Sequence, residues 1–427
     1  MQLFPHQNTA LKETEGQNRV AYYLDMGLGK TFVGSEKMMD LNARNNLIVC
    51  QKSKVQDWID HFFKYYIDST KCDETGAWCY DLTDKCGFDM FFHSRYKVRI
   101  GVINYDLVFR RPDLLNLENF TLMLDESSII QNEKAKRSKF ILKMQPENVI
   151  LLSGTPTSGK YENLWTQIHL LGWGISYQLF QRQYVNWKTI EVGGVPLKIV
   201  DKDDPYKNTE RLKNKLREHG AVFMKTEECF DLPEQTFIDI TVNSSKEYRK
   251  FKKDRIVTVG EGVELVGDTK LTQMLYERQL CGIYSQEKLQ AFKDLASSTQ
   301  DRLIVFYNFN DELYLLKLIA EELERPVSEV NGHTKDLTAY EEESSSITLI
   351  QYQAGSMGLN LQKANKIVYF TLPLMSELFE QSKKRIHRIG QSMSCFYYTM
   401  TVKNSIECNI KKVLEMRKDF TDDLFEV

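Results

Sequence analysis

Short apolar runs alternate with amphipathic stretches along most of this sequence. Each run is about the length of one buried strand, and the stretches between them carry the mixed polar and apolar positions of surface helices. Such alternation is typical of βα units around a parallel sheet. Five runs lie in the first half of the chain, at residues 20–24, 46–50, 98–103, 121–124 and 149–152. Four more follow at residues 302–307, 347–352, 366–370 and 395–402. The pattern predicts an α/β protein with two parallel sheets.

A proline marks the boundary between the two series of strands. Pro233 lies in the sequence DLPE at 231–234, where a helix cannot continue, so we expect a hinge near residues 228–236. The predicted domains are therefore residues 1–230 and 236–427. Within the first domain we expect an insertion at about residues 160–220, with a hairpin at 189–200 around Gly193 and Gly194 and a charged helix at 211–219.

Charge limits how this chain can bind a polyanion. Its 56 lysines and arginines face 59 acidic residues, which gives a net charge of −3 and no global field that would attract nucleic acid. Any such contact must be local. Each basic cluster is either a polyanion contact or a solvated helix face. The clusters lie at residues 134–139, 211–217, 246–255 and 383–388.

The remaining composition favours a cytoplasmic protein that has no membrane partner. No stretch approaches the roughly 18 apolar residues of a membrane span, and residues 1–5 lack a basic and then apolar leader. The eight cysteines are scattered, as in reduced proteins, so disulfides are not expected. Cys72, Cys79, Cys86 and His93 recur every seven residues, but structural zinc sites usually contain Cys-x2–4-Cys pairs, and we expect no zinc.

The first candidate for chemistry is a glycine-rich loop after the first predicted strand. The sequence DMGLGKT at 25–31 leads into a helix-like stretch. Gly27 and Gly29 would let backbone N–H groups approach phosphates, Lys30 could reach the β- and γ-phosphates, and the Thr31 hydroxyl could bind Mg²⁺. The strict phosphate-loop pattern fails because Leu24 occupies its first glycine position. A glycine-rich turn without a nucleotide is the alternative.

Two further predicted strands end in polar residues. Asp125 and Glu126 follow the strand at 121–124, at the sheet edge where ligands of α/β proteins bind. Asp125 could hold Mg²⁺ and Glu126 could deprotonate the water that attacks the γ-phosphate. The sequence SGTP at 153–156 ends the strand at 149–152, and its hydroxyls could sense the γ-phosphate. The alternatives are a solvated acidic turn and an ordinary strand-to-turn transition.

The second half supplies arginines. Gln381, Arg385 and Arg388 have the spacing i, i+4 and i+7, which predicts one common helix face. Arginines presented by a second domain could stabilise transition-state charge when the domains close. The alternative is a basic face that only solvates the helix. The glycine-containing loop at 353–361 follows another apolar strand and could approach a phosphate backbone.

In order, these segments resemble the motifs of superfamily 2 helicases, and specifically of the Snf-type (switch/sucrose nonfermenting) ATPases. The resemblance spans essentially the whole chain, and its most specific strings are MGLGKT at 26–31 and RIHRIGQ at 385–391. The sequence at residues 159–165 is similar to that of the compact family members carried by phages and prophages of Gram-positive bacteria. The other similar segments are the Q motif at 3–7 and motifs at 47–58, 102–105, 125–128, 153–165, 302–306, 331–333 and 353–361.

The resemblance implies a P-loop NTPase of the superfamily 2 helicase core, with two RecA-like domains that face each other across Mg-ATP. It assigns catalysis to five residues: Lys30, Asp125, Glu126, Arg385 and Arg388. It assigns nucleotide binding to Gln7, Gly27, Gly29, Lys30, Thr31, Gly358 and Gln381, and Mg²⁺ to Thr31 and Asp125. Ser128 and Ser356 stand where the family commonly has histidine and glycine, and these positions bear on coupling between nucleotide and DNA.

The implied function is a DNA-dependent ATPase that moves on double-stranded DNA through its phosphate backbone, in phage replication, recombination or repair. The chain would act as a monomer in the cytoplasm of a bacterial host, and a phage nuclease or replication protein is a candidate partner. Two alternatives stay open: a 3'-5' helicase that separates strands, and a catalytically silent DNA-binding scaffold that recruits a nuclease.

Overall fold

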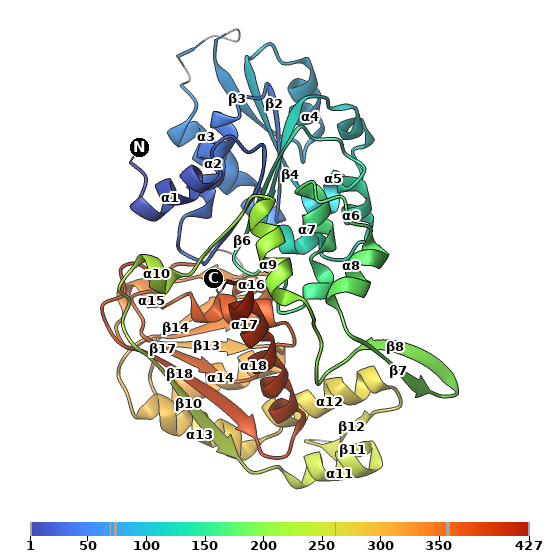
Figure 1. The fold of residues 1–427 in the computed structure, drawn as a ribbon. Helices are drawn as coiled ribbons and strands as arrows, with labels where there is room; N and C mark the ends of the chain where they lie inside the picture. Colours follow the sequence, from blue (N-terminus) through green and yellow to red (C-terminus); the bar gives the residue numbers. More distant parts are fainter. Residues whose placement is uncertain (1, 69, 72–74, 261, 356–358, 426–427) are drawn as a thin grey trace. The chain divides into compact units, whose positions relative to one another are not determined.

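The computed structural model describes residues 2–68, 70–71, 75–260, 262–355 and 359–425 (Figure 1). The chain divides into two compact units. One comprises Met1–Cys229 and Phe420–Val427, and the other comprises Phe230–Asp419. Each unit has its own sheet, so the predicted α/β class with two parallel sheets is confirmed.

In the described part of the first unit, seven parallel strands form one sheet in the order β3-β4-β2-β5-β6-β1-β9. All five strands predicted for this half are present. The sequence did not predict β3 and β9, which occupy the two edges of the sheet. The strands are β1 (Arg19–Leu24), β2 (Asn45–Cys50), β3 (Ala77–Asp81), β4 (Val98–Asn104), β5 (Phe120–Asp125), β6 (Asn148–Ser153) and β9 (Ala221–Met224).

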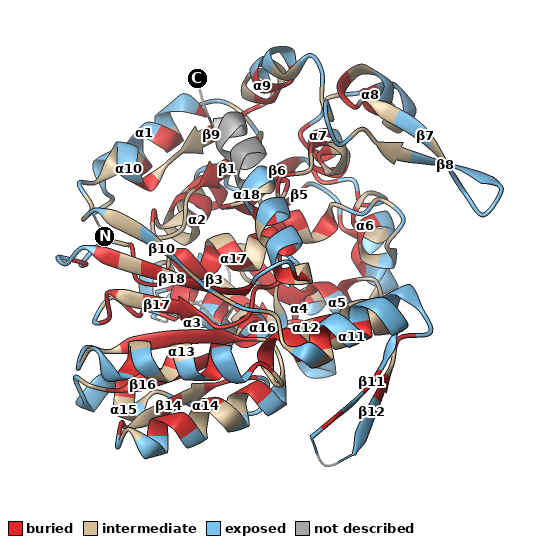
Figure 2. Ribbon diagram, turned by 90° about the horizontal axis from the view of Figure 1, so that it is seen from below, coloured by how far each residue is buried: buried red, intermediate tan, exposed pale blue. Residues whose placement is uncertain are grey.

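Helices cover both faces of this sheet, as Figure 1 shows. On one side, α2 approaches so closely that a Cβ at Gly34 would lie 2.9 Å from Leu152 of β6. The opposite side holds a large apolar core that includes Leu122 and Leu124, and the strands are accordingly buried in Figure 2. The helices are α1 (Pro5–Glu13), α2 (Lys30–Asp40), α3 (Val55–Tyr65), α4 (Lys85–His93), α5 (Tyr105–Val108), α6 (Lys136–Ile141) and α10 (Thr226–Cys229), with short 3-10 turns at Lys52–Lys54, Pro112–Asn116, Ser127–Ile130 and Tyr161–Asn163.

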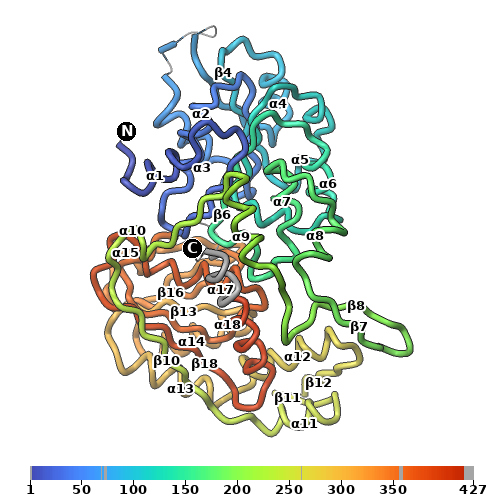
Figure 3. Tube along the Cα trace, in the orientation of Figure 1, coloured from blue at the N-terminus to red at the C-terminus, as the bar shows by residue number. Residues whose placement is uncertain are grey.

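The segment expected as an insertion packs on the first unit and sends out one hairpin. Helices α7 (Trp165–Leu170), α8 (Tyr177–Tyr184) and α9 (Thr209–Glu218) bury Ile168, Phe180 and Leu212 in the same core as the central strands. The predicted hairpin is confirmed as β7 (Trp187–Val192) and β8 (Val195–Val200), which extends away from this core in Figure 3. The predicted charged helix is α9.

His61 lies on α3, and its buried imidazole contacts α2. Its Nε2 lies 3.0 Å from the Ser35 hydroxyl, and its ring packs against Phe32 and Trp58 with centroid distances of 4.9 and 5.8 Å. Burial lowers the pKa of His61 to about 4. The native protein therefore keeps this ring neutral at pH values where the unfolded chain, with a pKa near about 6.5, already binds a proton.

This difference predicts a loss of stability in acid. Between the two pKa values the unfolded state binds more protons, so the free energy of unfolding falls as the pH drops from 6.5 towards 4. The His61 contribution to this loss should be about 2 kcal/mol between about pH 7.5 and pH 5. Urea denaturation of His61→Gln at both pH values should show that much less loss. The exposed His93→Gln variant serves as the control and should keep the wild-type dependence.

In the described part of the second unit, seven strands form one sheet in the order β10-β18-β17-β13-β16-β14-β15. The sheet is parallel except for β15, which pairs antiparallel with β14. All four predicted strands are present, and Figure 3 shows β10 beside β18 although about 160 residues separate them. The strands are β10 (Gln235–Val242), β13 (Leu303–Tyr307), β14 (Val327–Val330), β15 (Lys335–Asp336), β16 (Ile347–Gln351), β17 (Lys366–Tyr369) and β18 (Cys395–Val402).

Two apolar cores lie on the two faces of the second sheet. Leu303 and Val305 of β13 face one core, whereas Ile304 and Phe306 face the other, as the alternation of side chains along a strand requires. A smaller core under the hairpin β11 (Ile256–Val259) and β12 (Val263–Val266) holds Tyr248 and Phe251. The helices are α11 (Lys246–Asp254), α12 (Lys270–Gly282), α13 (Gln286–Ser297), α14 (Asn310–Glu322), α15 (Thr338–Glu342), α16 (Tyr352–Gly355), α17 (Ser376–Lys383) and α18 (Ile406–Phe425).

Candidate nucleotide-binding site

The glycine-rich loop joins β1 to α2 at the carboxyl edge of the first sheet. Gly27 and Gly29 have φ values of +89° and +74°, which side chains rarely adopt. A Cβ at Gly29 would also lie 2.3 Å from Nε2 of Gln7. Gly29 caps the N-terminus of α2, so the first helical residues, Lys30 and Thr31, begin where the helix dipole favours an anion.

The Lys30 ammonium group is held at this edge. It donates hydrogen bonds to the carbonyl oxygens of Leu24 at 2.9 Å and Asp25 at 3.4 Å. A Cβ at Gly154, in the turn after β6, would lie 3.4 Å from its Nζ. The loop after β1 and the turn after β6 therefore meet at Lys30.

Gln7 and His6 of α1 both contact the glycine-rich loop. Gln7 Nε2 donates to the carbonyl oxygens of Leu28 at 3.2 Å and Gly29 at 3.5 Å, and Gln7 Oε1 accepts from the Phe4 backbone N–H at 2.9 Å. His6 Nε2 lies 2.9 Å from the Leu28 carbonyl oxygen. The start of the chain is thereby fixed beside the loop, where a bound base could be contacted.

Asp25 connects the same loop to the segment that follows β9, an edge strand of the sheet. Its Oδ2 accepts hydrogen bonds from the backbone N–H and the hydroxyl of Thr226, at 3.2 and 3.0 Å. Thr226 is fully buried at the start of α10, directly after β9. A contact between residues 201 positions apart thus fixes the entrance to the loop.

Asp125 and Glu126 lie at the end of β5. Trp58 Nε1 donates to Asp125 Oδ2 at 2.9 Å, and the Tyr105 hydroxyl donates to the Asp125 carbonyl oxygen at 2.9 Å. Burial raises the pKa of Asp125, while the bond from Trp58 and the positive charge of Lys30 oppose this rise. Glu126 adopts the left-handed conformation at φ +53°, a strained backbone for this residue type and one that is frequent at active sites.

The donor set at this edge suits Mg²⁺. The half-buried carboxylate of Asp125, whose pKa desolvation raises, is costly to ionise without a cation, and Lys30 lies close enough to influence its protonation. Carboxylate and hydroxyl oxygens are hard ligands of the kind that Mg²⁺ uses together with phosphate oxygens. Asp125 and Thr31 therefore fit the ion, which would neutralise charge on the phosphates of a bound nucleotide.

A buried glutamine connects three of these segments. Gln167 of α7 is fully buried, and its Oε1 accepts hydrogen bonds from the hydroxyls of Tyr23 on β1 at 3.0 Å and Ser127 at 2.7 Å. Its Nε2 donates to the Pro156 carbonyl oxygen at 2.7 Å. One side chain thus links β1, the residue after Glu126 and the turn after β6.

Replacing Gln167 with leucine is expected to lower both stability and ATP turnover. The change leaves the buried hydroxyls and the carbonyl oxygen without these partners, which should cost about 2–4 kcal/mol. It also releases the segment that positions Glu126, so the turnover number should fall even under conditions where the variant is fully folded. Denaturation curves and steady-state ATPase rates measure the two effects. Thr166→Val, nearly isosteric at the neighbouring buried position, should leave turnover within about two-fold of wild type.

Arg385 and Arg388 do not share a helix face, and that prediction is wrong. The helix α17 ends at Lys383, and both arginines lie in the turns that follow. The cause is a tertiary contact: Gln391 Nε2 donates to the carbonyl oxygens of Ala364 at 2.8 Å and Ile386 at 3.3 Å, which holds the segment in a compact turn.

Both arginines instead contact the end of the glycine-containing loop, at Leu359 and Asn360. Arg385 is buried and its Nη1 donates to the Leu359 carbonyl oxygen at 3.4 Å, whereas Arg388 is half-buried and donates to Asn360 Oδ1. Gln381 is buried on α17 and donates to Glu377 Oε1 at 3.3 Å. Gly358 and Ser356, which the sequence analysis singled out in this loop, lie outside the described residues.

Three residues at the site of the first unit were not predicted from the sequence as partners of the motifs. Trp58 and Thr226 bond to Asp125 and Asp25, and no local pattern links positions so far apart in the chain. Gln167 did leave a signal, because it is a polar residue between the apolar Leu164 and Ile168 in a short helix. A polar side chain on an apolar helix face usually bonds to a buried partner.

Two cysteines and the histidine of the seven-residue series lie in described elements. Cys79 is buried in β3 and Cys86 is exposed on α4, while Cys72 lies outside the described residues. His93 contacts its own helix, with Nδ1 2.8 Å from the Asp89 carbonyl oxygen. No helix within the described ranges combines the length and the apolar character that a membrane crossing requires.

Comparison with known proteins gives matches over both units. Residues 23–285 match the SNF2-related domain, and residues 287–390 match the helicase conserved C-terminal domain. The uncharacterized ATP-dependent helicase YqhH of Bacillus subtilis is 23% identical, over 96% of this chain and 77% of that protein. The ISWI chromatin-remodeling complex ATPase ISW1 of Saccharomyces cerevisiae is 21% identical, over 93% of this chain but only 38% of that protein. Among solved structures, the chain is similar to the Sulfolobus solfataricus SWI2/SNF2 ATPase core in complex with dsDNA. The match includes 99% of this chain and 92% of that one, with 18% identity and a TM-score of 0.46.

Proposed function

Because this chain belongs to the SNF2-related family of helicase-like ATPases, with two RecA-like domains, we propose that it couples ATP hydrolysis to movement along double-stranded DNA. One observation carries the proposal. The loop at Lys30, the carboxylate of Asp125 and the turn at Gly154 converge at one sheet edge, as binding of a nucleoside triphosphate requires.

Each residue at this edge has a proposed task. Gly27, Gly29 and the start of α2 bind phosphate oxygens through backbone N–H groups, and the Lys30 ammonium neutralises the β- and γ-phosphates. Thr31 and Asp125 hold Mg²⁺. Glu126 orients the attacking water and accepts its proton. Gln7 contacts the adenine base beside Gly29.

The second unit supplies the remaining groups in this proposal. Arg388 and Arg385 stabilise the charge that develops on the γ-phosphate, and Gln381 and Gly358 contact the nucleotide. The functional domains are residues 1–230 and 236–427. A change of domain arrangement during each ATP cycle would alter the hold on DNA, which is gripped through its phosphates and with little sequence preference.

The biological setting is also a proposal. The sequence at residues 159–165 supports the proposal that the chain is a compact phage or prophage member of the family, which serves DNA replication, recombination or repair. Such a protein would work as a monomer in the bacterial cytoplasm, beside a phage nuclease or replication protein.

Steady-state ATPase rates test the proposal. They should be measured without nucleic acid, and with single strands, blunt duplex, forked duplex and RNA, at two salt concentrations. We expect strong stimulation by blunt duplex, weaker stimulation at high salt, and little effect of RNA. Stimulation by single strands or forks alone would favour a strand-separating helicase. A rate of zero with every nucleic acid would favour a catalytically silent scaffold.

A further inference from the structure

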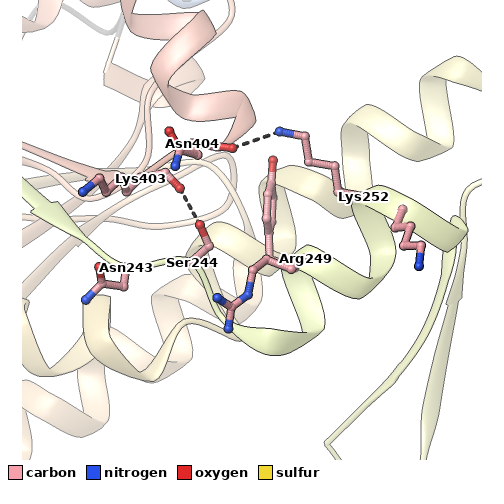
Figure 4. Close-up of a pocket in the computed structure, with 8 residues that line it drawn as sticks. Asn243, Ser244, Arg249, Lys252, Lys403 and Asn404 are labelled. Carbon is pink, nitrogen blue, oxygen red and sulfur yellow. Dashed lines mark hydrogen bonds between the residues drawn. The ribbon is translucent and has the colours of Figure 1, made fainter.

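A basic pocket lies in the second unit at the carboxyl ends of β10 and β18. Its volume is about 510 Å³. Figure 4 shows that its side chains come from the loop after β10, from α11 and from the loop after β18. The lining residues are Asn243, Ser244, Tyr248, Arg249, Lys252, Lys253, Lys403 and Asn404.

Four of these residues are cations, namely Arg249, Lys252, Lys253 and Lys403, and none of the described residues that line the pocket is acidic. The acidic neighbour that contacts the rim is Glu287, whose Oε2 accepts the backbone N–H of Asn243 at 2.9 Å. The four cations are exposed to solvent and therefore accessible to a ligand. Such a concentration of positive charge fits a phosphate group.

The pocket is built from segments that are tied together. The Lys403 backbone N–H donates to the Val242 carbonyl oxygen at 2.8 Å, and the Ser244 hydroxyl donates to the Lys403 carbonyl oxygen. Lys252 Nζ donates to the Asn404 carbonyl oxygen at 3.0 Å, as Figure 4 shows. At the base, Tyr248 is almost fully buried and its hydroxyl accepts the Ile406 backbone N–H at 2.8 Å. The backbone under the cations is therefore fixed.

Its place on the sheet also favours a ligand. β10 and β18 run parallel to β17, β13 and β16, so their carboxyl ends share one edge with the end of β16, where α16 begins. Ligands of open parallel sheets bind along this edge. The first turn of α11, which Ser245 caps, adds the positive end of a nine-residue helix.

A solvated helix face does not account for this arrangement. Arg249, Lys252 and Lys253 lie three and four residues apart and hence on one face of α11, while Lys403 joins them from the loop after β18, about 150 residues later. Lys246 and Lys250 lie on the same helix but outside the pocket.

We propose that this pocket binds a backbone phosphate of the duplex DNA. The inference rests on the proposed function, because it adds a DNA contact to the motor. The same chemistry could bind a free phosphate or the phosphates of a nucleotide, and the test separates these sources.

The test compares two double variants that reverse the same amount of charge on the same helix. Arg249→Glu with Lys253→Glu changes the pocket, and Lys246→Glu with Lys250→Glu is the matched control. Duplex DNA binding is measured by fluorescence anisotropy over a range of salt concentrations, and thermal melting checks the fold of each variant. The pocket variant should bind about ten-fold more weakly, and its plot of log affinity against log salt should be flatter by about one, because one phosphate contact is lost.

The control should retain the wild-type slope, and ATP turnover without DNA should be unchanged in both variants. If the pocket variant does not fold, Lys403→Gln, in the loop after β18, replaces it in the test. This variant should also weaken DNA binding. Equal losses in pocket and control variants would overturn the inference, since they would indicate diffuse charge. The inference would also be overturned if the pocket variant lost affinity for inorganic phosphate or ATP but bound duplex DNA as tightly as the wild type. If the wild-type protein binds no duplex, the proposed function fails as well.

Discussion

Replacing Glu126 by glutamine is expected to lower the rate of ATP hydrolysis by about 10²–10⁴-fold and to leave ATP binding nearly unchanged. The glutamine keeps the size of the side chain and one acceptor oxygen, but its amide cannot accept the proton of the attacking water. In the proposed site, Lys30 and the loop at Gly27 and Gly29 hold the phosphates, and the substitution does not touch these residues. Turnover in steady state and binding of a fluorescent ATP analogue measure the two quantities separately.

Glu133→Gln provides the control for this experiment, because it removes a carboxylate seven residues further along, outside the site. That variant should hydrolyse ATP at the wild-type rate. A Glu126→Gln enzyme that turns over within ten-fold of wild type would mean that another group accepts the proton, and the assignment of Glu126 would be wrong.

The second large effect is expected at Arg388. Replacement by alanine should reduce turnover by about 10³-fold, because a guanidinium that contacts the γ-phosphate stabilises charge that appears only in the transition state. Arg388→Lys should recover a small part of the loss, since an ammonium group cannot form the paired hydrogen bonds of a guanidinium. The affinity for ATP should change far less than the rate.

Asn360→Ala is the matched control for Arg388→Ala. It breaks the hydrogen bond between Arg388 Nη1 and Asn360 Oδ1 but keeps the guanidinium itself. If Arg388 acts on the nucleotide, Asn360→Ala should stay within about ten-fold of wild type. If both variants lose activity equally, Arg388 has a structural role in the segment 359–361, and its catalytic assignment fails.

The strands that the sequence predicted and those that it did not differ in where they lie. In the two seven-stranded sheets the predicted strands are all inner ones, whose two covered faces require continuous apolar runs, and three of them, β1, β4 and β18, lie next to an edge strand. The strands of these two sheets without a prediction, β3, β9, β10, β14 and β15, lie at or next to the sheet edges, and the hairpin β11–β12, also without a prediction, forms a two-stranded sheet of its own. β10 shows the reason, because its residues alternate between half-buried and exposed, and Phe237 is 55% exposed. An edge strand needs no continuous apolar run.

The candidate site divides in the same way. Asp125 and Glu126 could be found because they stand at the end of an apolar strand, and Lys30 because a glycine-rich loop joins another apolar strand to it. A parallel sheet brings such positions to one edge. The contacts of Trp58 and Thr226 could not be found, since they depend on how distant helices pack. The turn at Arg385 and Arg388 could not be predicted either, because the local spacing favours a helix and the hydrogen bond from Gln391 to Ala364 is a contact between distant residues.

Displacement of a third strand from a triplex tests the central proposal most directly, because it reports movement along duplex DNA without separation of its strands. The wild-type protein with ATP should release the third strand and leave the duplex intact, and Glu126→Gln should release none. Release that does not need ATP, or unwinding of tailed duplexes without release of the third strand, would contradict a motor on double-stranded DNA.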